Sequence, residues 1–316
     1  MNVDDLVERA RTGDARAVAR LISLVENASP SLRDVMAALT PYAGNAWVIG
    51  LTGSPGVGKS TSTSVLVSAF RGAGKRVGVL AVDPSSPFSG GALLGDRVRM
   101  QEHALDDGVY IRSMASRGHL GGLSWSTPQA LRVLDAAGCD VVLVETVGVG
   151  QAEVEVASLA DTTVVLVAPG MGDAIQAAKA GILEIADVFV VNKADRDGAD
   201  QTARDLRHML SLGERRAAGD WQPPIVKTVA ARGEGVDELV AALDKHWNWL
   251  AESGRLDAKR RLRAADEIEA IAVTALRARI GDLRGGSLLD ELAGRVVAGQ
   301  ADPYSAADEL VAGVTA

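Results

Sequence analysis

The chain has 316 residues, of which 47% are hydrophobic and only 3% aromatic, and its formal net charge is −8 at neutral pH. This length can bury one large α/β core and leaves room for helical additions. The acidic balance, without a long basic run, argues against nucleic acid or an anionic membrane as the main partner.

The first part of the chain, residues 1–44, is expected to form an N-terminal helical extension. Apolar residues recur at helical spacing between Val18 and Val25, behind a cap at Asp14, and Ser31 could cap a following helix. The N-terminus is acidic and lacks the apolar core of a signal peptide. No apolar stretch is long enough to cross a bilayer. Together with a single cysteine, Cys139, these features predict a cytoplasmic protein whose lone thiol is buried and structural.

From residue 46 onward, short β-branched runs alternate with helical stretches. The expected strands are Trp47–Leu51, Arg76–Val82, Val109–Ile111, Asp140–Val144, Thr163–Val167, Val188–Val191 and Ile225–Lys227. Apolar strands separated by helices predict an α/β fold with a mainly parallel sheet covered by helices on both faces. The region 45–253 is therefore interpreted as one nucleotide-binding domain, with its ligand at the carboxyl ends of the strands.

The last part of the chain, residues 254–316, carries no strand pattern. A helical stripe of apolar residues runs from Leu262 to Leu276 among many charges, Gly285 and Gly286 predict a turn, and Ser305 with Asp308 resembles a capping box. An exposed helical hairpin cannot easily bury its apolar face alone. This region is expected to pack on the core or on a second subunit, which favours a homodimer.

The segment Gly53–Ser60, which reads Gly-Ser-Pro-Gly-Val-Gly-Lys-Ser, fits the phosphate-loop pattern and lies between an expected strand and an expected helix. Its glycines let backbone N–H groups point inward, and the helix start adds partial positive charge. Lys59 is expected to reach the β- and γ-phosphates, and the Ser60 hydroxyl to coordinate Mg²⁺. The expected phosphate-binding residues are Gly53, Ser54, Gly56, Val57, Gly58, Lys59, Ser60 and Thr61.

Carboxylates suited to Mg²⁺ follow two of the expected strands. Asp83 ends one strand and Glu145 another, so both are delivered to the nucleotide edge, and Asp96 is a further candidate on spacing. Acidic residues also cap helices after strands, which is the structural alternative for Asp83 and Glu145. Gly148, just beyond Glu145, would let a backbone amide approach the γ-phosphate and sense hydrolysis.

The tetrapeptide Asn192-Lys193-Ala194-Asp195 follows the strand that ends at Val191 and fits a guanine reader. The Asp195 carboxylate can accept hydrogen bonds from both guanine N1–H and the 2-amino group, a donor pair that adenine lacks. The Lys193 stem can lie along the base, and Asn192 can tie this loop to the phosphate loop. After the strand ending at Lys227, backbone amides at Ala230 or, preferably, Ala231 are expected to meet guanine O6. The predicted ligands are therefore GTP and GDP.

With these motifs assembled, the chain resembles the SIMIBI class of phosphate-loop GTPases. Within that class it is most similar to the methylmalonyl-CoA mutase-associated GTPase chaperones, the MeaB/ArgK-like family. The motifs that carry the resemblance begin at Asp83 (DPSSPFSGG), Leu94 (LGDRVRM), Glu145 (ETVGVGQ) and Asn192 (NKAD). The similarity covers nearly the whole chain, including both helical extensions.

The resemblance implies that Asp83, Asp96 and Glu145 surround Mg²⁺ and its waters. It also implies a homodimer formed partly by the C-terminal helices, and an adenosylcobalamin-dependent acyl-CoA mutase as client, whose cofactor loading is gated by GTP. The stretch 169–179 is similar to the third switch of the family, with Asp173, Gln176 and Lys179 as the relay; Ala174 stands where relatives commonly carry an acidic residue.

For catalysis we expect Lys59 and Glu145 to act on the phosphates and the metal. The group that orients the attacking water is left open between Arg99, Gln151 and a residue supplied by the client, so a slow intrinsic rate is expected. The sequence leaves two alternative functions. A nickel metallochaperone GTPase would need His or Cys clusters, and the four histidines are scattered. A small-molecule kinase, for instance one acting on an amino acid, would need a second pocket for an acceptor, and no such set of residues stands out.

Overall fold

The computed structural model describes residues 2–83, 100–103, 105–115, 126–146, 152–170, 181–212, 219–280 and 287–315. It divides into two compact units, Met1–Lys259 and Arg260–Ala316. In the part of the chain that is described, no helix is both long and apolar enough to span a membrane.

The first unit is built on a seven-stranded parallel sheet with the order β3-β2-β4-β1-β5-β6-β7. The strands are β1 (Trp47–Thr52), β2 (Val77–Asp83), β3 (Val109–Ala115), β4 (Val141–Thr146), β5 (Thr162–Val167), β6 (Val188–Val191) and β7 (Ile225–Lys227). The α/β fold and all seven expected strands are confirmed; β3 runs four residues further than expected because it pairs with β2 as far as Asp83. Both motif-bearing strands, β1 and β6, end at the same edge of this sheet.

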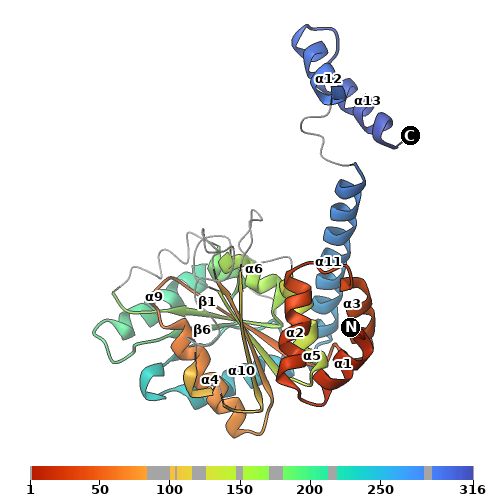
Figure 1. The fold of residues 1–316 in the computed structure, drawn as a ribbon. Helices are drawn as coiled ribbons and strands as arrows, with labels where there is room; N and C mark the ends of the chain where they lie inside the picture. Colours follow the sequence, from red (N-terminus) through yellow and green to blue (C-terminus); the bar gives the residue numbers. More distant parts are fainter. Residues whose placement is uncertain are drawn as a thin grey trace. The chain divides into compact units, whose positions relative to one another are not determined.

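Helices cover both faces of the sheet because alternate strand residues point to opposite sides. Odd-numbered β1 residues such as Ile49 and Leu51 join a core with α4 (Lys59–Gly72) and α10 (Val236–Glu252), whereas Val48 joins the core on the other face. The elements on that other face are α1 (Val3–Arg11), α2 (Ala15–Glu26), α3 (Leu32–Leu39), η1 (Thr40–Tyr42), α5 (Thr127–Ala136), α6 (Ala152–Leu159), α8 (Ile182–Ile185) and α9 (Ala199–Leu212). Figure 1 shows α1, α2, α3 and α5 gathered at one side of the sheet.

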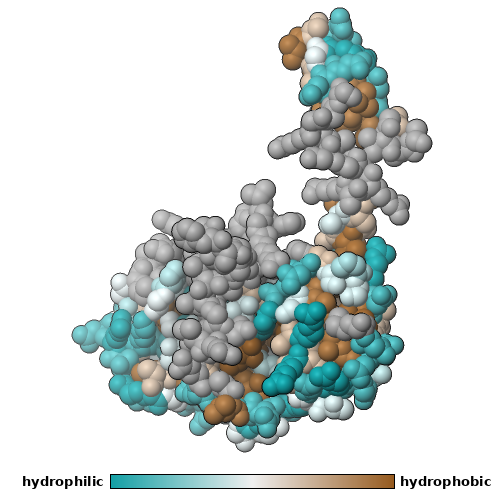
Figure 2. Space-filling view, in the orientation of Figure 1, coloured by the Kyte–Doolittle hydropathy of each residue, from teal (hydrophilic) through white to brown (hydrophobic). Residues whose placement is uncertain are grey.

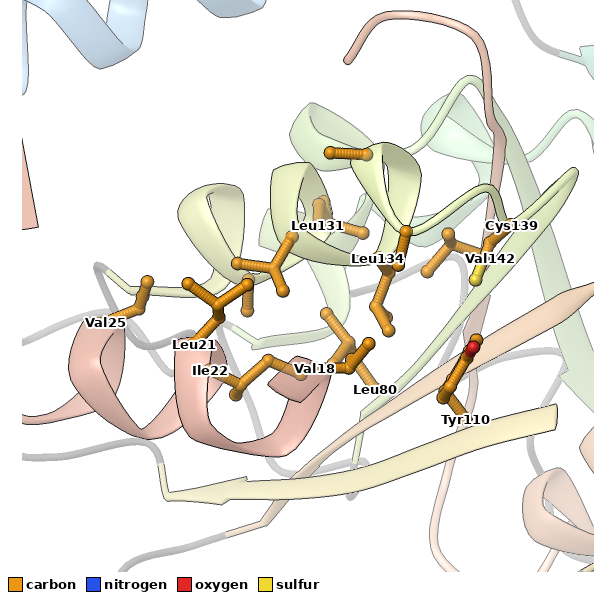
Figure 3. Close-up of a cluster of buried hydrophobic side chains, with 14 of the residues drawn as sticks. Val18, Leu21, Ile22, Val25, Leu80, Tyr110, Leu131, Leu134, Cys139 and Val142 are labelled. Carbon is orange, nitrogen blue, oxygen red and sulfur yellow. The ribbon is translucent and has the colours of Figure 1, made fainter. Parts of the chain in front are cut away.

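The N-terminal helices share the core of the nucleotide-binding domain. Leu21 and Val25 of α2 are fully buried, and Leu21 lies beside Leu131 of α5 (Figure 3). Asp14 caps α2 as expected, by accepting hydrogen bonds from two backbone N–H groups. The apolar stripe of α2 therefore finds its partner within its own subunit.

Two local expectations near this core concern Ser31 and Cys139. Ser31 is the N-cap residue of α3 as expected, but its hydroxyl contacts Ser29 and makes no side-chain capping bond. Cys139 is buried as expected, and burial raises the pKa of its thiol to about 12. The thiol is thus protonated at neutral pH, as befits a packing residue.

A buried polar cluster stabilises the end of the sheet opposite the strand carboxyl termini. His246 of α10 is 1% exposed and packs against the rings of Trp221 and Trp249, which also contact each other. Its Nδ1 is 2.9 Å from the Thr162 hydroxyl, and its Nε2 is 3.3 Å from a carboxylate oxygen of Asp187. The Asp187 carboxylate also accepts a backbone hydrogen bond of 2.8 Å from the N–H of residue 163. These contacts join β5, α10 and the segment before β6.

The same carboxylate is expected to make a pH-dependent contribution to stability. Burial alone would raise the pKa of Asp187, but the hydrogen bond to His246 and the charge of Lys259 outweigh it, so this pKa lies below its ordinary value. Asp187→Asn should lower the free energy of unfolding by about 2 kcal/mol at pH 7. Because the folded-state pKa is depressed, this stabilisation is present above the unfolded-state pKa of about 3.9 and is lost as the pH falls through the folded-state pKa.

Urea unfolding at several pH values, followed by tryptophan fluorescence, measures this contribution. The difference between the parent protein and Asp187→Asn should narrow below about pH 4. Asp244→Asn, on the exposed side of the same helix α10, is the control and should change stability little. A difference that stays constant from pH 7 to pH 3 would contradict this account.

The second unit is helical. It contains α11 from residue 260 onward (the whole helix is Arg255–Ile280), α12 (Ser287–Val297) and α13 (Pro303–Thr315). Arg295 of α12 pairs with Glu309 of α13 at 2.9 Å. The cap of α13 is Asp302, which accepts from two backbone N–H groups, so the expected Ser305–Asp308 capping box is wrong. Large apolar side chains are exposed on this unit (Figure 2), among them Leu262, Ile268, Leu276 and Val297.

Candidate nucleotide-binding site

The phosphate loop connects the carboxyl end of β1 to the first turn of α4, as its sequence predicts. Two positions of the loop require glycine, because the backbone there has a positive φ and other atoms lie where a Cβ would be. Gly53 has φ +139°, and a Cβ there would lie 2.2 Å from the backbone oxygen of Leu166. Gly58 has φ +97°, and a Cβ there would lie 2.3 Å from the Asn192 side chain. Glycine alone is compatible with this combination of left-handed backbone and close packing.

Lys59 is the first residue of α4, and its side chain turns back over the loop. It is only 7% exposed, and its ammonium donates hydrogen bonds to the backbone oxygens of Gly53 at 2.5 Å and Ser54 at 3.1 Å. A buried ammonium at a helix N-terminus, inside a curled glycine loop, forms an anion-binding concavity. This arrangement is suited to the terminal phosphates of a nucleotide.

Ser60 and Glu145 meet although they are 85 residues apart in the chain. The Ser60 hydroxyl donates a short hydrogen bond to a carboxylate oxygen of Glu145, which is 4% exposed. The parallel pairing of β1 with β4 places Leu51 opposite Glu145, which brings this carboxylate to the start of the loop. A hydroxyl beside a buried carboxylate is a set of hard oxygen donors that fits Mg²⁺.

Asp83 is the last residue of β2, two register positions beyond the residue that pairs with Glu145. It therefore ends at the same edge of the sheet as Glu145. The other expected metal, catalytic, γ-phosphate and switch positions lie outside the described residues: Asp96, Arg99, Gly148, Gln151, Asp173, Gln176 and Lys179. Within the described ranges, no three His, Cys, Asp or Glu side chains are close enough together to hold a metal ion.

The expected base-reading loop, residues 192–195, follows β6 and is tied to the phosphate loop through Asn192. The Asn192 side chain is buried, and its amide donates 2.8 Å to the backbone oxygen of Val57. Its amide oxygen accepts from the Thr228 hydroxyl and from the backbone N–H of Ala230, both at 3.1 Å. The Asn192 side chain therefore joins the three loops that follow β1, β6 and β7.

Lys193 and the pair Ala230-Ala231 lie next to Asn192 at the carboxyl edge of the sheet. Lys193 has φ +56° and donates 2.6 Å to the backbone oxygen of Gly56, so its stem crosses toward the phosphate loop. Ala230 and Ala231 form the short helix η3 (Ala230–Arg232). The backbone N–H of Ala230 is engaged by Asn192, which leaves Ala231 as the better candidate for guanine O6.

Sequence reasoning missed two side chains near the base reader. Thr228 supports Asn192, and Arg232 lies 3.4 Å from a carboxylate oxygen of Asp195. Arg232 and Asp195 are 37 positions apart in the chain. No local sequence pattern marks this contact.

Comparison with known proteins agrees with this geometry. The sequence model of one protein family, described as methylmalonyl-CoA mutase-associated GTPase MeaB, matches residues 18–282. The chain belongs to the MeaB family. This match includes the phosphate loop, the Glu145 segment and the base-reading loop, and it extends into α11.

Relatives of this MeaB-family chain are themselves named as GTPases. A putative GTPase of Pyrococcus abyssi is 49% identical over 98% of this chain and 96% of its own. The GTPase ArgK of Escherichia coli is 39% identical over 82% of this chain and 80% of its own. A solved structure described as LAO/AO transport system kinase has a TM-score of 0.74 at 27% identity, covering 100% of this chain and 99% of its own. The chain is thus a P-loop GTPase that binds a guanine nucleotide.

Proposed function

We propose that this GTPase is a Mg²⁺-dependent chaperone for an adenosylcobalamin-dependent acyl-CoA mutase, with methylmalonyl-CoA mutase as the first client to test. The observation that carries the proposal is the match of residues 18–282 to a family described as mutase-associated. A mouse mitochondrial relative, named methylmalonic aciduria type A homolog, is 40% identical over 67% of this chain and 52% of its own. Gating of cofactor loading and protection of the mutase are the roles proposed for GTP hydrolysis.

The residues of the phosphate edge have separate roles in this proposal. Lys59 neutralises charge on the β- and γ-phosphates, and the backbone of the loop orients them. Ser60, Glu145, Asp83 and Asp96 would hold Mg²⁺ and its waters, and a bound Mg²⁺ would neutralise charge that develops between the two terminal phosphates. The contact of Ser60 with buried Glu145 supports this assignment.

Glu145→Gln should raise the Mg²⁺ concentration needed for half-maximal GTP hydrolysis by about 10-fold or more, the usual cost of losing an outer-sphere carboxylate. The amide keeps the size of the side chain but removes the charge that favours the metal. The measurement is phosphate release across a Mg²⁺ titration at saturating GTP. Glu184→Gln, on the exposed side of α8, is the matched control. An unchanged Mg²⁺ requirement would remove Glu145 from the metal site.

Coupling to the client is proposed to run through the segment that carries Asp173, Gln176 and Lys179. Hydrolysis without the client is proposed to be slow, with Arg99, Gln151 or a client residue orienting the attacking water. The rate measured alone and with the purified mutase tests this. A fast intrinsic rate that the mutase leaves unchanged would contradict it.

The C-terminal unit is proposed to be a dimerisation arm. Leu262, Ile268 and Leu276 are each more than half exposed on α11, so burial against a second copy would remove apolar surface from water. Ile268→Glu should shift the molecular mass in solution from dimer toward monomer. Light scattering coupled to size-exclusion chromatography measures this, and Glu267→Gln on the same helix is the control.

The identity of the client is tested by capture from native extract. The tagged protein is loaded with a non-hydrolysable GTP analogue, with GDP, or with no nucleotide, and retained proteins are identified by mass spectrometry. Asp195→Asn serves as the matched control, since it should not hold the guanine analogue. Recovery of a cobalamin mutase in a nucleotide-dependent manner supports the proposal. Recovery only of nickel enzymes would overturn it. In a separate assay, the formation of a phosphorylated small-molecule product from GTP would also overturn it.

A further inference from the structure

The loop after β7 is held rigidly next to the base-reading loop. Val229 and Glu234 form an isolated antiparallel bridge, with backbone hydrogen bonds of 3.0 and 3.3 Å in the two directions. The N–H of Arg232 donates 2.8 Å to the backbone oxygen of Val229, and Gly233 has φ +72°. A turn closed in this way fixes the direction in which the Arg232 side chain leaves the backbone.

Arg232 lies between two carboxylates. Its Nε donates 2.8 Å to one oxygen of Glu234, and its Nη2 lies 3.4 Å from the other, so Glu234 orients the guanidinium from one side. On the other side, Nη1 lies 3.4 Å from Oδ2 of Asp195. The hydrogen bond to Glu234, followed by the charges of Glu234 and Asp195, raises the pKa of Arg232, which therefore stays charged at any physiological pH.

The contact with Asp195 is single and long. A guanidinium that competed with guanine would be expected to take both carboxylate oxygens in the bidentate geometry that arginine favours. Here only Oδ2 is approached, by one nitrogen, whereas the close contact of the guanidinium is made with Glu234. A carboxylate offers about four lone-pair sites, so Oδ1 and part of Oδ2 remain suited to the N1–H and 2-amino donors of guanine.

We propose that Arg232, oriented by Glu234, is a positioning residue that holds the Asp195 carboxylate in the orientation that reads guanine. This inference rests on Asp195 being the base reader, as proposed above. Arg232 would reduce the freedom of Asp195 before the nucleotide arrives and would offset the cost of turning its charge toward the base. Its influence would fall on nucleotide affinity, since the described contacts of its side chain are with Glu234 and with Asp195, the residue expected to read the base.

Exposure limits the size of this effect. The Arg232 and Asp195 side chains are 52% and 38% exposed, so solvent and salt screen their interaction. Arg232→Gln is therefore expected to raise the Kd for GDP and the KM for GTP by about two- to fivefold at low salt, with kcat unchanged. The difference from the parent protein should shrink as NaCl is raised toward about 1 M, where charges are screened over about 3 Å.

The test measures GDP and ADP binding by calorimetry with Mg²⁺, and steady-state GTP hydrolysis, for four full-length variants. Arg232→Lys keeps the charge and should recover part of the affinity; Glu234→Gln should weaken binding less than Arg232→Gln because it removes only the orienting partner. Arg204→Gln, an exposed arginine of α9 that contacts Gln201, is the control and should match the parent protein. Thermal unfolding of each variant reports whether the fold is kept.

The outcomes separate this inference from the function beneath it. If the parent protein binds GDP and not ADP, but Arg232→Gln binds GDP equally well or more tightly, the positioning role is refuted while the base reader stands. If Arg232→Gln lowers kcat and leaves KM unchanged, Arg232 acts on the chemical step and the inference also fails. If the parent protein does not prefer GDP to ADP, the assignment of Asp195 itself is wrong.

Discussion

Lys59→Met is expected to reduce GTP hydrolysis by at least about 100-fold, the scale of loss when one preorganised charge donor is removed from a phosphoryl-transfer or acyl-transfer site. The ammonium of Lys59 is buried over the phosphate loop, 2.5 Å from the Gly53 oxygen and 3.1 Å from the Ser54 oxygen. Methionine keeps the length of the side chain and removes its charge and its donors. Affinity for GTP should also fall, because the same charge faces the phosphates before reaction.

Phosphate release under saturating GTP, together with calorimetric binding of GTP and GDP, measures both effects. Lys75→Met removes an exposed lysine just beyond the other end of α4 and should leave hydrolysis within about twofold of the parent protein, as surface substitutions usually do. Thermal unfolding confirms that both variants are folded. Hydrolysis by Lys59→Met at more than about a tenth of the parent rate would show that the loop serves another purpose.

Asp195→Asn is expected to weaken GDP binding by about 100-fold or more, since two charge-assisted hydrogen bonds to the base are lost or reversed. The asparagine amide presents one oxygen and one NH2 group to the base. Xanthine offers N1–H and a carbonyl at position 2, so the amide should pair with xanthine where the carboxylate would repel it. The variant should therefore gain affinity for XDP while it loses affinity for GDP.

Binding of GDP, XDP and ADP to both proteins decides this prediction. Asp200→Asn makes the same chemical change five residues along the chain, at a side chain paired with Lys227 at 2.8 Å, and should leave base preference unaltered. If Asp195→Asn bound GDP as tightly as the parent protein, guanine would have to be read by some other group. An exchange of preference from GDP to XDP is the result that supports Asp195 as the base reader.

The shared edge of the sheet would let these two side chains act on one molecule. The phosphate loop follows β1 and the proposed base reader follows β6, with β5 between the two strands. Asn192 spans that distance by donating to Val57 while accepting from Thr228 and Ala230. A nucleotide bound along this edge would meet its phosphate site and its base site in one rigid frame.

Local patterns in the chain were sufficient to predict the strands, and they put the phosphate loop and the proposed base-reading loop directly after two of those strands. These patterns involve residues that are close together in the sequence: β-branched runs, glycine spacing, and the order of strand, loop and helix. They therefore indicate that Gly53, Lys59 and Asn192 lie just beyond the ends of strands. The caps show the limit of this reasoning. Asp14 does cap its helix, but Ser31 turns to Ser29, because a hydroxyl chooses among several nearby partners.

Only the tertiary structure decided which distant side chains meet. The order of parallel strands and their register bring Arg232 to Asp195 and His246 to Asp187, pairs for which the sequence has no local signal. They also put Ser60 and Glu145, both expected at the metal site, in direct contact. Packing likewise placed α2 in the core of the nucleotide-binding domain, although its sequence shows no more than an apolar stripe. The periodicity of apolar residues predicts which face of an element is buried. Which element packs against that face depends on the fold of the whole chain.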